Sequence, residues 1–475
     1  MKNKRHLGGA LSDTRLRAAV VCCTWLSACA GGAPLQPPRE VPAAFQYGPR
    51  DGSWPAQDWY RGFGSAELNG FVDLAVSSNG DLAGARERVL QADARARQAG
   101  AAILPSVDAN ANASYLSGHS QQGSGHELDW LAMLSASYEV DFWGKNRASA
   151  RAAALEAAAS RAERDTVALT MLGGVADEYF QVLALRERIT IAESNRDNAQ
   201  KVLAIVQARF DAGMASPVDL AAQKAALYSA QIALTDLQQS EVEARAALAV
   251  LLGRMPENFP VEGRSLDALA EPAVAAGLPS ELLTRRPDVV MAEANLRAAS
   301  ANLAAARAAM LPSLTLTASA GVQNPALPAT VLTIAGSGPS LALTANLMQP
   351  IFNHGKLRAQ RDETAARERE LLAAYRSAVL AALVDVEKAL SALQHLDAER
   401  EFQSGNLAES ERAFEGARLR YEKGSGDFLT LLEAQRTLYA ARDQFTQYRL
   451  ARLEGLIALC KALGGGWSSA SGASS

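Results

Sequence analysis

The feature that most restricts the fold of this chain is an internal duplication. Residues 209–213 (RFDAG) match residues 420–424 (RYEKG), and the spacing of about 211 residues continues without a gap to Leu252-Gly253 against Leu463-Gly464. Farther upstream, residues 103–107 (ILPSV) match residues 310–314 (MLPSL). The matching pairs occur in the same order in both halves. We therefore predict a tandem repeat, in which the second half builds the same kinds of element as the first.

Each half contains two stretches in which apolar and polar residues alternate. The apolar positions are Val107, Ala109, Ala111, Ala113 and Tyr115; Ala132, Leu134, Ala136, Tyr138, Val140 and Phe142; Leu314, Leu316, Ala318, Ala320 and Val322; and Leu341, Leu343, Ala345, Leu347 and Ile351. A period of two over about ten residues is typical of transmembrane strands, although half-buried soluble strands share it. We predict β-hairpins at about 104–142 and 311–351. Their loops are expected at 117–125 and 324–338, which are rich in Gly, Ser or Pro.

A long helical hairpin is predicted after each β-hairpin. Residues 144–212 and 355–423 contain no proline, and each run would be about 100 Å long as one helix. Each run turns at a glycine, Gly213 or Gly424, and returns as a shorter helix at about 216–253 or 426–463. The predicted long hairpins therefore span about 144–253 and 355–463, with the apolar stripe of a coiled coil.

These elements divide the chain into successive parts. The first structural repeat covers 65–253 and begins with helices, one of them at about 80–102. A Pro-broken connector at 254–279 leads to the second repeat at 280–463, which also begins with a helix. Residues 464–475 are rich in Gly and Ser, and we predict that they are disordered.

The first residues have the pattern of an export signal. Lys2, Lys4 and several arginines precede a short apolar run at 18–26, which ends in the sequence Leu26-Ser27-Ala28-Cys29. We predict a signal peptide at 1–28 and lipidation of Cys29, followed by an extended lipidated segment at 29–64. An ordinary signal peptide with a nearby cysteine is the alternative. After cleavage only Cys460 keeps a thiol, and its apolar neighbours predict a buried, unreactive side chain.

Composition excludes several classes of function. The net charge of −4 and the pI of about 5.9 argue against a nucleic-acid-binding protein. No run of about 18 apolar residues follows the signal, which argues against a helical membrane span. The five histidines are scattered without metal-ligand spacing, so we predict no metal site and no cofactor apart from the lipid. No catalytic constellation stands out, and we predict that the protein is not an enzyme.

Closing the predicted sheet requires more than one copy of the chain. Four strands cannot close a barrel, and an open sheet edge cannot face lipid. Two copies would supply eight strands, and side chains would fill the interior of such a barrel. Three copies would supply twelve strands, which leave room for a bore. The long helices must then extend about 100 Å away from the membrane. The sequence thus predicts a conduit.

The chain resembles the TolC-like outer membrane factors, in their lipoprotein branch (OprM-like or NodT-type efflux proteins). The resemblance covers nearly the whole chain, and five segments carry it. They are residues 26–29 (LSAC), 138–145 (YEVDFWGK), 282–288 (LLTRRPD), 350–358 (PIFNHGKLR) and 420–436 (RYEKGSGDFLTLLEAQR). The resemblance implies an α+β membrane protein that forms a homotrimer with a 12-stranded β-barrel and a periplasmic α-helical tunnel. The implied partners are a periplasmic adaptor, an inner-membrane pump of the resistance-nodulation-division type and outer membrane lipid.

The resemblance also implies a gate at the helix tips. Leu429 and Glu433 match the constriction positions of the family, and three copies of Glu433 would form an acidic ring. Asp219 and Tyr421 match positions that tie neighbouring tips in the closed state. Gly213 and Gly424 would turn the tips where the adaptor docks. Each residue also has a simpler role as an alternative. Leu429 would pack in the coiled-coil core, and Glu433 would pair with Arg436. Asp219 would cap the start of a helix, and Tyr421 would lie on the surface.

The predicted function is the outer membrane channel of a tripartite efflux system, a passive exit duct for drugs or other toxic small molecules. One alternative is the channel of type I protein secretion. A second is a lipid-anchored periplasmic coiled-coil scaffold that never spans the membrane. The Phe-Trp-Gly-Lys block at 142–145 and the lipidation signal favour efflux, and the sequence does not identify the substrate.

Overall fold

The computed structural model describes residues 42–47, 54–120, 123–257, 259–274, 276–328 and 339–465, with the backbone alone at 116–129 and 323–340 within these ranges. The predicted signal peptide, Cys29 and the tail after Gly465 therefore lie outside the described residues. The predicted loop at 324–338 lies largely outside them as well.

The helices repeat in the order that the duplication predicts. The first half contains α2 (Ala66–Ser78), α3 (Gly80–Ala101), α4 (Lys145–Asp211) and α5 (Pro217–Leu251). The second half contains α6 (Leu282–Arg285), α7 (Pro287–Ala308), α8 (Lys356–Glu422) and α9 (Phe428–Ala462). Helices α4 and α8 each have 67 residues, and α5 and α9 each have 35. Their bounds keep the offset of about 211 residues, so the two helical hairpins align residue by residue without a gap.

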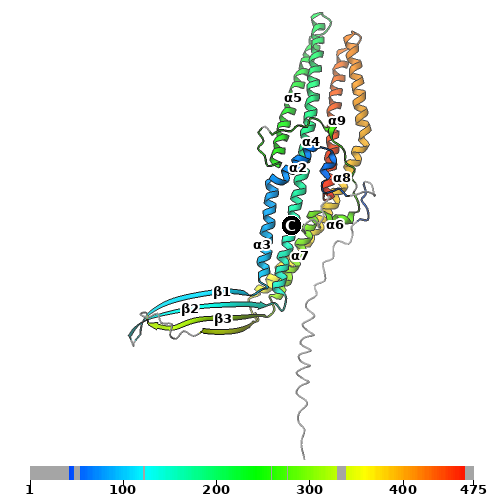
Figure 1. The fold of residues 1–475 in the computed structure, drawn as a ribbon. Coiled ribbons are helices and arrows are strands. Elements are labelled where there is room, and N and C mark those ends of the chain that lie inside the picture. The colour runs from blue at the N-terminus through cyan, green and yellow to red at the C-terminus, as the bar shows by residue number, and fades with distance from the viewer. Residues whose placement is uncertain are drawn as a thin grey trace, which may run out of the picture. The chain divides into compact units, whose positions relative to one another are not determined.

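The long hairpins lie side by side and end in two tip turns at the far end from the sheet (Figure 1). Their turns are built by local hydrogen bonding. Gly213 and Gly424 have φ values of 69° and 76°, a conformation that glycine adopts without the steric cost of a Cβ. Beyond the first turn, Ser216 and Asp219 form a reciprocal capping box at the start of α5. In the second, Asp427 caps α9 by accepting the backbone N–H of Thr430 at 2.9 Å. None of the described helices is both long and apolar enough to cross a membrane.

Four antiparallel strands form one sheet in the order β1-β2-β3-β4. They are β1 (Ser106–Ser120), β2 (Gly123–Val140), β3 (Ser313–Pro328) and β4 (Pro339–Met348). The prediction of a loop at 117–125 was wrong, because strand pairing continues as far as Ser120 with Gly123. Backbone hydrogen bonds to a neighbouring strand do not depend on side-chain polarity, so a Gly- and Ser-rich segment can extend the hairpin.

The main core lies where α4, α5 and α9 meet the N-terminal segment. Trp59 and Phe63 are buried there, and the Phe63 ring packs edge-to-face on Phe180 with centroids 4.9 Å apart. Residues Trp59–Phe63 form a 3₁₀ helix, which corrects the expectation of an extended segment up to residue 64, because burying these rings requires a compact turn. Cys460 is free and fully buried, and burial raises the pKa of its thiol to about 12. The prediction of a buried thiol is therefore confirmed.

The connector and the two glycines that follow α9 are more ordered than their composition indicates. The connector contains the short 3₁₀ helix Leu266–Ala268, and another, Pro279–Glu281, begins at its last residue. Arg186 on α4 holds it by donating to the backbone oxygens of Val261 and Gly263, both at 2.6 Å. At the chain end, Gly464 and Gly465 are buried, with the N–H of Gly465 bonded to the Cys460 oxygen at 2.7 Å. The prediction of disorder was wrong for these two glycines, since they close the C-terminus of α9.

Candidate functional site

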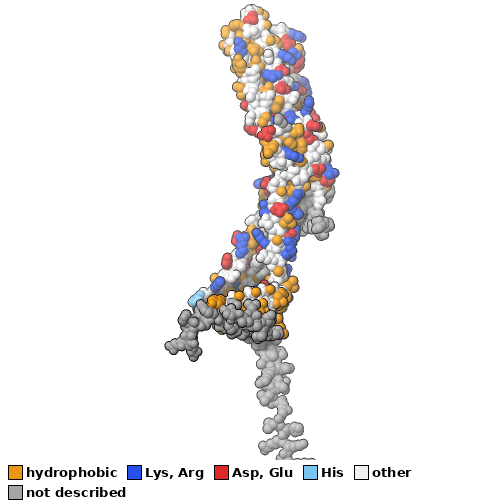
Figure 2. All heavy atoms as spheres, turned by 60° about the vertical axis from the view of Figure 1, so that its left-hand side comes forward, with side chains coloured by type: hydrophobic (Ala, Val, Ile, Leu, Met, Phe, Trp, Pro, Cys, Tyr) orange, Lys and Arg blue, Asp and Glu red, His pale blue; other side chains and the backbone are white. Residues whose placement is uncertain are grey.

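One face of the sheet is apolar across all four strands. The register pairs Ala109 with Leu134, Leu134 with Ala320, and Ala320 with Leu341. Directly paired residues of antiparallel strands point to the same face, so the four predicted apolar stripes merge into one surface. It is open in the single copy, where Leu134 is 54% exposed and Leu341 is 83% exposed. Figure 2 shows hydrophobic side chains gathered over the described part of the sheet.

An open apolar surface of this extent needs apolar surroundings. The other face carries mostly polar residues, including Asp108, Ser135, Glu139, Thr317 and Thr344. An arrangement of this kind suits a sheet with lipid on one side and water on the other.

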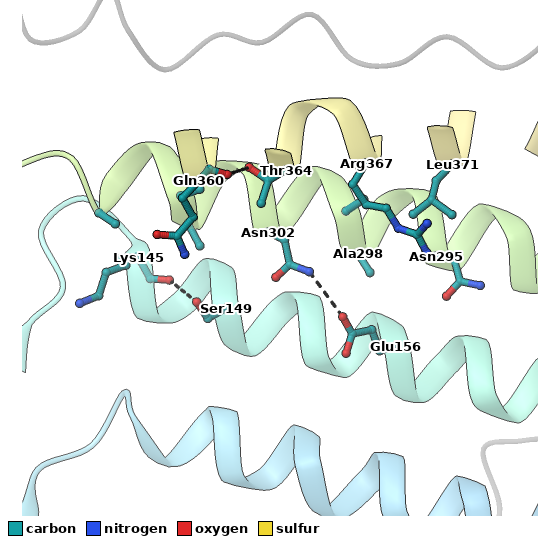
Figure 3. A pocket seen from close by; sticks show the side chains of 14 residues that line it. Lys145, Ser149, Glu156, Asn295, Ala298, Asn302, Gln360, Thr364, Arg367 and Leu371 are labelled. Atoms are coloured by element: carbon teal, nitrogen blue, oxygen red, sulfur yellow. Dashed lines mark hydrogen bonds between the residues drawn. The ribbon is translucent and has the colours of Figure 1, made fainter. Parts of the chain in front are cut away.

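The polar face of the sheet continues into the helices. Glu139, near the end of β2, accepts a salt bridge from Nζ of Lys145, the first residue of α4, at 2.6 Å. Lys145 also lines a groove of about 590 Å³ between α4, α7 and α8. Figure 3 shows Asn295, Asn302 and Gln360 along this groove, with Asn302 donating to Glu156 at 3.4 Å. The salt bridge therefore links the polar face of the sheet to this groove.

Two exposed aromatic residues mark the junction between sheet and helices. Phe142 and Phe352 are 65% and 78% exposed, and each stands shortly before the glycine that precedes a long helix. Trp143 donates its indole N–H to the Pro312 oxygen at 2.8 Å, which joins the two repeats at this level. Aromatic side chains of this kind are enriched where a membrane-spanning sheet meets water.

The two tips of one copy are joined by an arginine that the sequence interpretation did not single out. Nη1 of Arg209, at the end of α4, donates to the backbone oxygen of Tyr421 at 3.0 Å. The Arg209 guanidinium also lies over the Tyr421 ring, 4.5 Å from its centroid. Tyr421 is buried against Phe428, and burial raises the pKa of its phenol. The signal that could have found Arg209 is its duplication as Arg420.

The predicted tie between Asp219 and Tyr421 involves residues that lie near each other within one copy. The Asp219 charge is close enough to contribute to the raised pKa of Tyr421. Its carboxylate accepts the backbone N–H of Ser216 at 3.0 Å, so Asp219 also has the helix-start role of the simpler alternative. Tyr421 is not a surface residue, because only 4% of it is exposed.

Leu429 and Glu433 lie one turn apart at the start of α9, and both are exposed. Leu429 is 71% exposed, which excludes it from the coiled-coil core of the single copy. Their side chains are thus free to meet other copies of the chain. The four residues of the predicted gate lie at the two tips of one copy.

Arg286 joins three helices of the second repeat. Its guanidinium donates to Asp288 at 2.7 Å, to Asp385 of α8 at 3.1 Å and to the Ala462 oxygen at the end of α9 at 3.1 Å. Burial opposes its charge, but the two carboxylates raise its pKa. Arg286 belongs to the Leu-Leu-Thr-Arg-Arg-Pro-Asp segment, and the structure shows that this motif has a packing role.

The two repeats pack together through α4, which contacts both α7 and α9. Arg188 donates to Asp443 at 2.6 Å, and Asp177 lies 3.8 Å from Nζ of Lys461. Burial raises the pKa of Asp177 to about 6, and Lys461 opposes this shift. Gly173 lets the helices approach, since a Cβ there would collide with the Lys461 side chain. Within the described part of the chain, no group of three or more His, Cys, Asp or Glu residues could hold a metal ion.

Comparisons with known proteins agree with this arrangement. The outer membrane efflux protein family profile matches residues 71–254 and 278–465. The chain is 43% identical over 465 residues to the pyoverdine export outer membrane protein OpmQ of Pseudomonas aeruginosa, covering 95% of this chain and 96% of the relative. It is 31% identical over 430 residues to the toluene efflux pump outer membrane protein TtgF of Pseudomonas putida, covering 87% and 86%.

Solved structures share the fold. The outer-membrane channel OprN matches with a TM-score of 0.85 at 26% identity, covering 92% of this chain and all of that one. The open state of the Neisseria gonorrhoeae MtrE outer membrane channel matches with a TM-score of 0.82 at 33% identity, covering 92% and 98%. These matches confirm the predicted TolC-like, tandem-duplicated fold, and with it a channel rather than an enzyme.

Members of this family form trimers and work with an adaptor and an inner-membrane pump. The predicted outer membrane location, with the helices forming a periplasmic tunnel, is confirmed as well. The chain belongs to the outer membrane efflux protein family and is the outer membrane channel component of a tripartite efflux system.

Proposed function

We propose that three copies of this chain form a passive exit duct for small molecules that a resistance-nodulation-division pump delivers. The observation that carries the proposal is the apolar sheet face, open in one copy and joined to helices of 67 residues with a polar wall. Three copies would supply twelve strands, which is enough for a bore. The duct would do no chemistry, and the pump would supply the energy.

Pyoverdine is the first solute to test. Relatives from Pseudomonas aeruginosa and Pseudomonas putida that are named for pyoverdine export are each 43% identical to this chain. Relatives named for toluene efflux are 31% and 30% identical, and a relative named for cation efflux is 29% identical. These names favour small-solute efflux over protein secretion. A lipid-anchored scaffold would leave the apolar sheet face in water, which argues against that alternative.

The test uses a strain whose own pyoverdine channel has been deleted. Expression of this chain should restore pyoverdine in the medium, and the purified protein should conduct ions in a planar lipid bilayer. Ion conductance without restored export would support the duct but overturn the proposal that pyoverdine is its substrate. A purified protein without conductance and without trimeric native mass would overturn the duct itself.

The gate at the tips gives a prediction in the same bilayer. Leu429 and Glu433 are exposed on one face of α9 and would form an apolar collar and an acidic ring around the threefold axis. Leu429→Ala should widen the constriction and raise single-channel conductance several-fold. Glu433→Gln should reduce the preference for cations, because it removes three charges from the narrowest level.

The control for the gate is Val218→Ala, which changes the equivalent residue of the first tip. Val218 is 74% exposed and Leu429 is 71% exposed. The first tip, however, has Ala222 at the position where the second tip has Glu433. An equal increase for Val218→Ala and Leu429→Ala would contradict a constriction formed by the second tip. Asp219 and Tyr421 are proposed to stabilise the closed state, so Tyr421→Phe should raise conductance less than Leu429→Ala.

Lipid on Cys29 is proposed as a membrane anchor in addition to the sheet. It is supported by the sequence Leu26-Ser27-Ala28-Cys29 after a short apolar run. Cys29→Ala should abolish incorporation of labelled palmitate, while Cys460→Ala should leave it unchanged, because Cys460 is buried. Labelling of the Cys29→Ala protein would contradict the site.

A further inference from the structure

The two repeats differ in charge where the sheet meets the long helices. In the first repeat the chain neutralises its own cations at the start of α4. Lys145 and Arg147 are the first and third residues of this helix. Glu139 lies 2.6 Å from Nζ of Lys145, and Asp141 lies 3.1 Å from Nε of Arg147. Both cations therefore have a carboxylate partner within the chain.

The second repeat keeps the two cations but lacks the carboxylates. Lys356 and Arg358 are again the first and third residues of the helix, here α8. No acidic residue occurs between Glu293 and Asp362, and Asp362 pairs with Arg361 at 2.6 Å. Among the residues that the structure describes, Lys356 and Arg358 have no salt-bridge partner, and both are exposed. Two positive charges are thus left open at the start of α8.

Exposed apolar side chains stand directly before these cations. Ile351 is 94% exposed and Phe352 is 78% exposed. The Phe352 ring packs on the His354 ring, with centroids 4.5 Å apart. His354 has a φ of 52°, which no other non-glycine residue in the described part of the chain matches in sign. A backbone conformation of this kind is costly and often marks a functional turn.

This segment lies at the boundary between the sheet and the helices. Nε2 of Gln349 donates to the Met310 oxygen at 3.3 Å, and the Trp143 indole donates to the Pro312 oxygen at 2.8 Å. Both acceptors lie between α7 and β3, so α4 and α8 start at the same level. Because the sheet spans the outer membrane and the helices form the periplasmic tunnel, this level is the membrane surface that faces the periplasm.

We propose that Ile351, Phe352, Lys356 and Arg358 form a binding site for an anionic phospholipid of the leaflet that faces the periplasm. The lipid phosphate would pair with the two cations. Arginine can bind a phosphate through two parallel N–H donors, and lysine adds a point charge. The acyl chains would cover the two apolar side chains. The proposal requires that the sheet spans the membrane, but not that the channel carries a particular solute.

A lipid fits this surface better than a free anion does. Beside a free anion, Ile351 and Phe352 would stay in water, whereas a lipid supplies both a charge and an apolar part. Ile351 also continues the apolar positions of β4, whose face meets lipid along the sheet. The first repeat would not bind a second lipid in this way, because Glu139 and Asp141 already neutralise its cations. We therefore expect one site in each copy and three in a trimer.

The test is lipid binding to the detergent-extracted trimer, measured by native mass spectrometry. Dioleoylphosphatidylglycerol, which is anionic, and dioleoylphosphatidylcholine, which has no net charge, are titrated separately. Since each cation near a membrane surface favours anionic lipid by a similar factor, the two cations should make phosphatidylglycerol bind about thirtyfold more tightly. The double variant Lys356→Gln/Arg358→Gln should bind the two lipids equally.

The matched control is Arg420→Gln/Lys423→Gln at the other end of α8. These residues are also one arginine and one lysine, and both are exposed. They lie roughly 100 Å from the start of the helix, so the preference for phosphatidylglycerol should remain. If both double variants lost the preference, net charge would be its cause, and the site would be wrong.

Two further outcomes separate the lipid site from its alternatives. Loss of the trimeric mass in Lys356→Gln/Arg358→Gln would show that these cations bind the neighbouring copy instead of a lipid. A conducting trimer of the unchanged protein that binds both lipids equally would overturn the lipid site and leave the duct intact. A monomeric native mass would overturn both.

Discussion

Leu134→Arg is expected to prevent assembly of the channel in the outer membrane. Leu134 lies on β2 between Ala109 and Ala320, in the middle of the apolar sheet face. An arginine on the lipid side of a membrane-spanning strand costs about 2–4 kcal/mol near the bilayer midplane, and a trimer carries the substitution three times. The heat-modifiable trimer band in outer membrane fractions should be lost.

The neighbouring residue supplies the control for this variant. Ser135 lies on the polar face, and its register partner on β1 is Asp108. Ser135→Arg should assemble as the unchanged protein does, since its guanidinium would face water and a carboxylate. Urea titrations of folding into lipid vesicles should show a large loss of stability for Leu134→Arg alone. Equal behaviour of the two variants would show that the apolar face does not meet lipid.

Arg286→Ala is expected to destabilise the second repeat by about 3 kcal/mol. Removing one member of a buried ion pair typically costs 3–5 kcal/mol, because the remaining charges lose their partner. The lower end applies here, since the side chains of Asp288 and Asp385 are 31% and 49% exposed and can be partly hydrated. The Ala462 oxygen also loses its donor, which loosens the end of α9.

This loss can be measured by denaturant unfolding of the trimer in detergent. The control is Arg297→Ala on the same helix, α7, where the side chain is 58% exposed and lies 3.6 Å from Glu293. Exposed pairs of this kind contribute at most about 0.5 kcal/mol. If the two alanine variants unfolded at the same denaturant concentration, the role assigned to Arg286 would be wrong.

Several features of the fold could be predicted because they depend on neighbours in the sequence. A run without proline between two glycines predicts a long helix, and α4 and α8 fill the predicted runs to within a residue at each end. Strict alternation predicts a strand with two different faces. The duplication supports these predictions further, because each predicted element had to occur twice and in the same order.

The errors arose where local composition conflicts with contacts formed elsewhere. The segment 117–125 has the composition of a loop, but a neighbouring strand supplies its hydrogen bonds. Gly464 and Gly465 have the composition of a flexible tail, but they close α9 against the core. The sequence of each segment does not show the strand or the core that it contacts.

The gate residues stay a prediction, and one contact at the tips was missed. The gate residues were carried over from the family resemblance, and Leu429 and Glu433 are exposed as a gate requires. Arg209 was missed because its partner, the Tyr421 oxygen, is 212 residues away and is a backbone atom that every residue possesses. No sequence pattern marks which carbonyl accepts a distant guanidinium.

The sequence by itself determined the tandem repeat, the lengths of the helices and the two-sided strands, because periodicity, proline and glycine act on the backbone locally. Only the tertiary structure decided the register that merges four apolar stripes into one face, the link between the two tips and the packing role of Arg286. These depend on distances between residues far apart in the chain, which are set when the helices and strands pack.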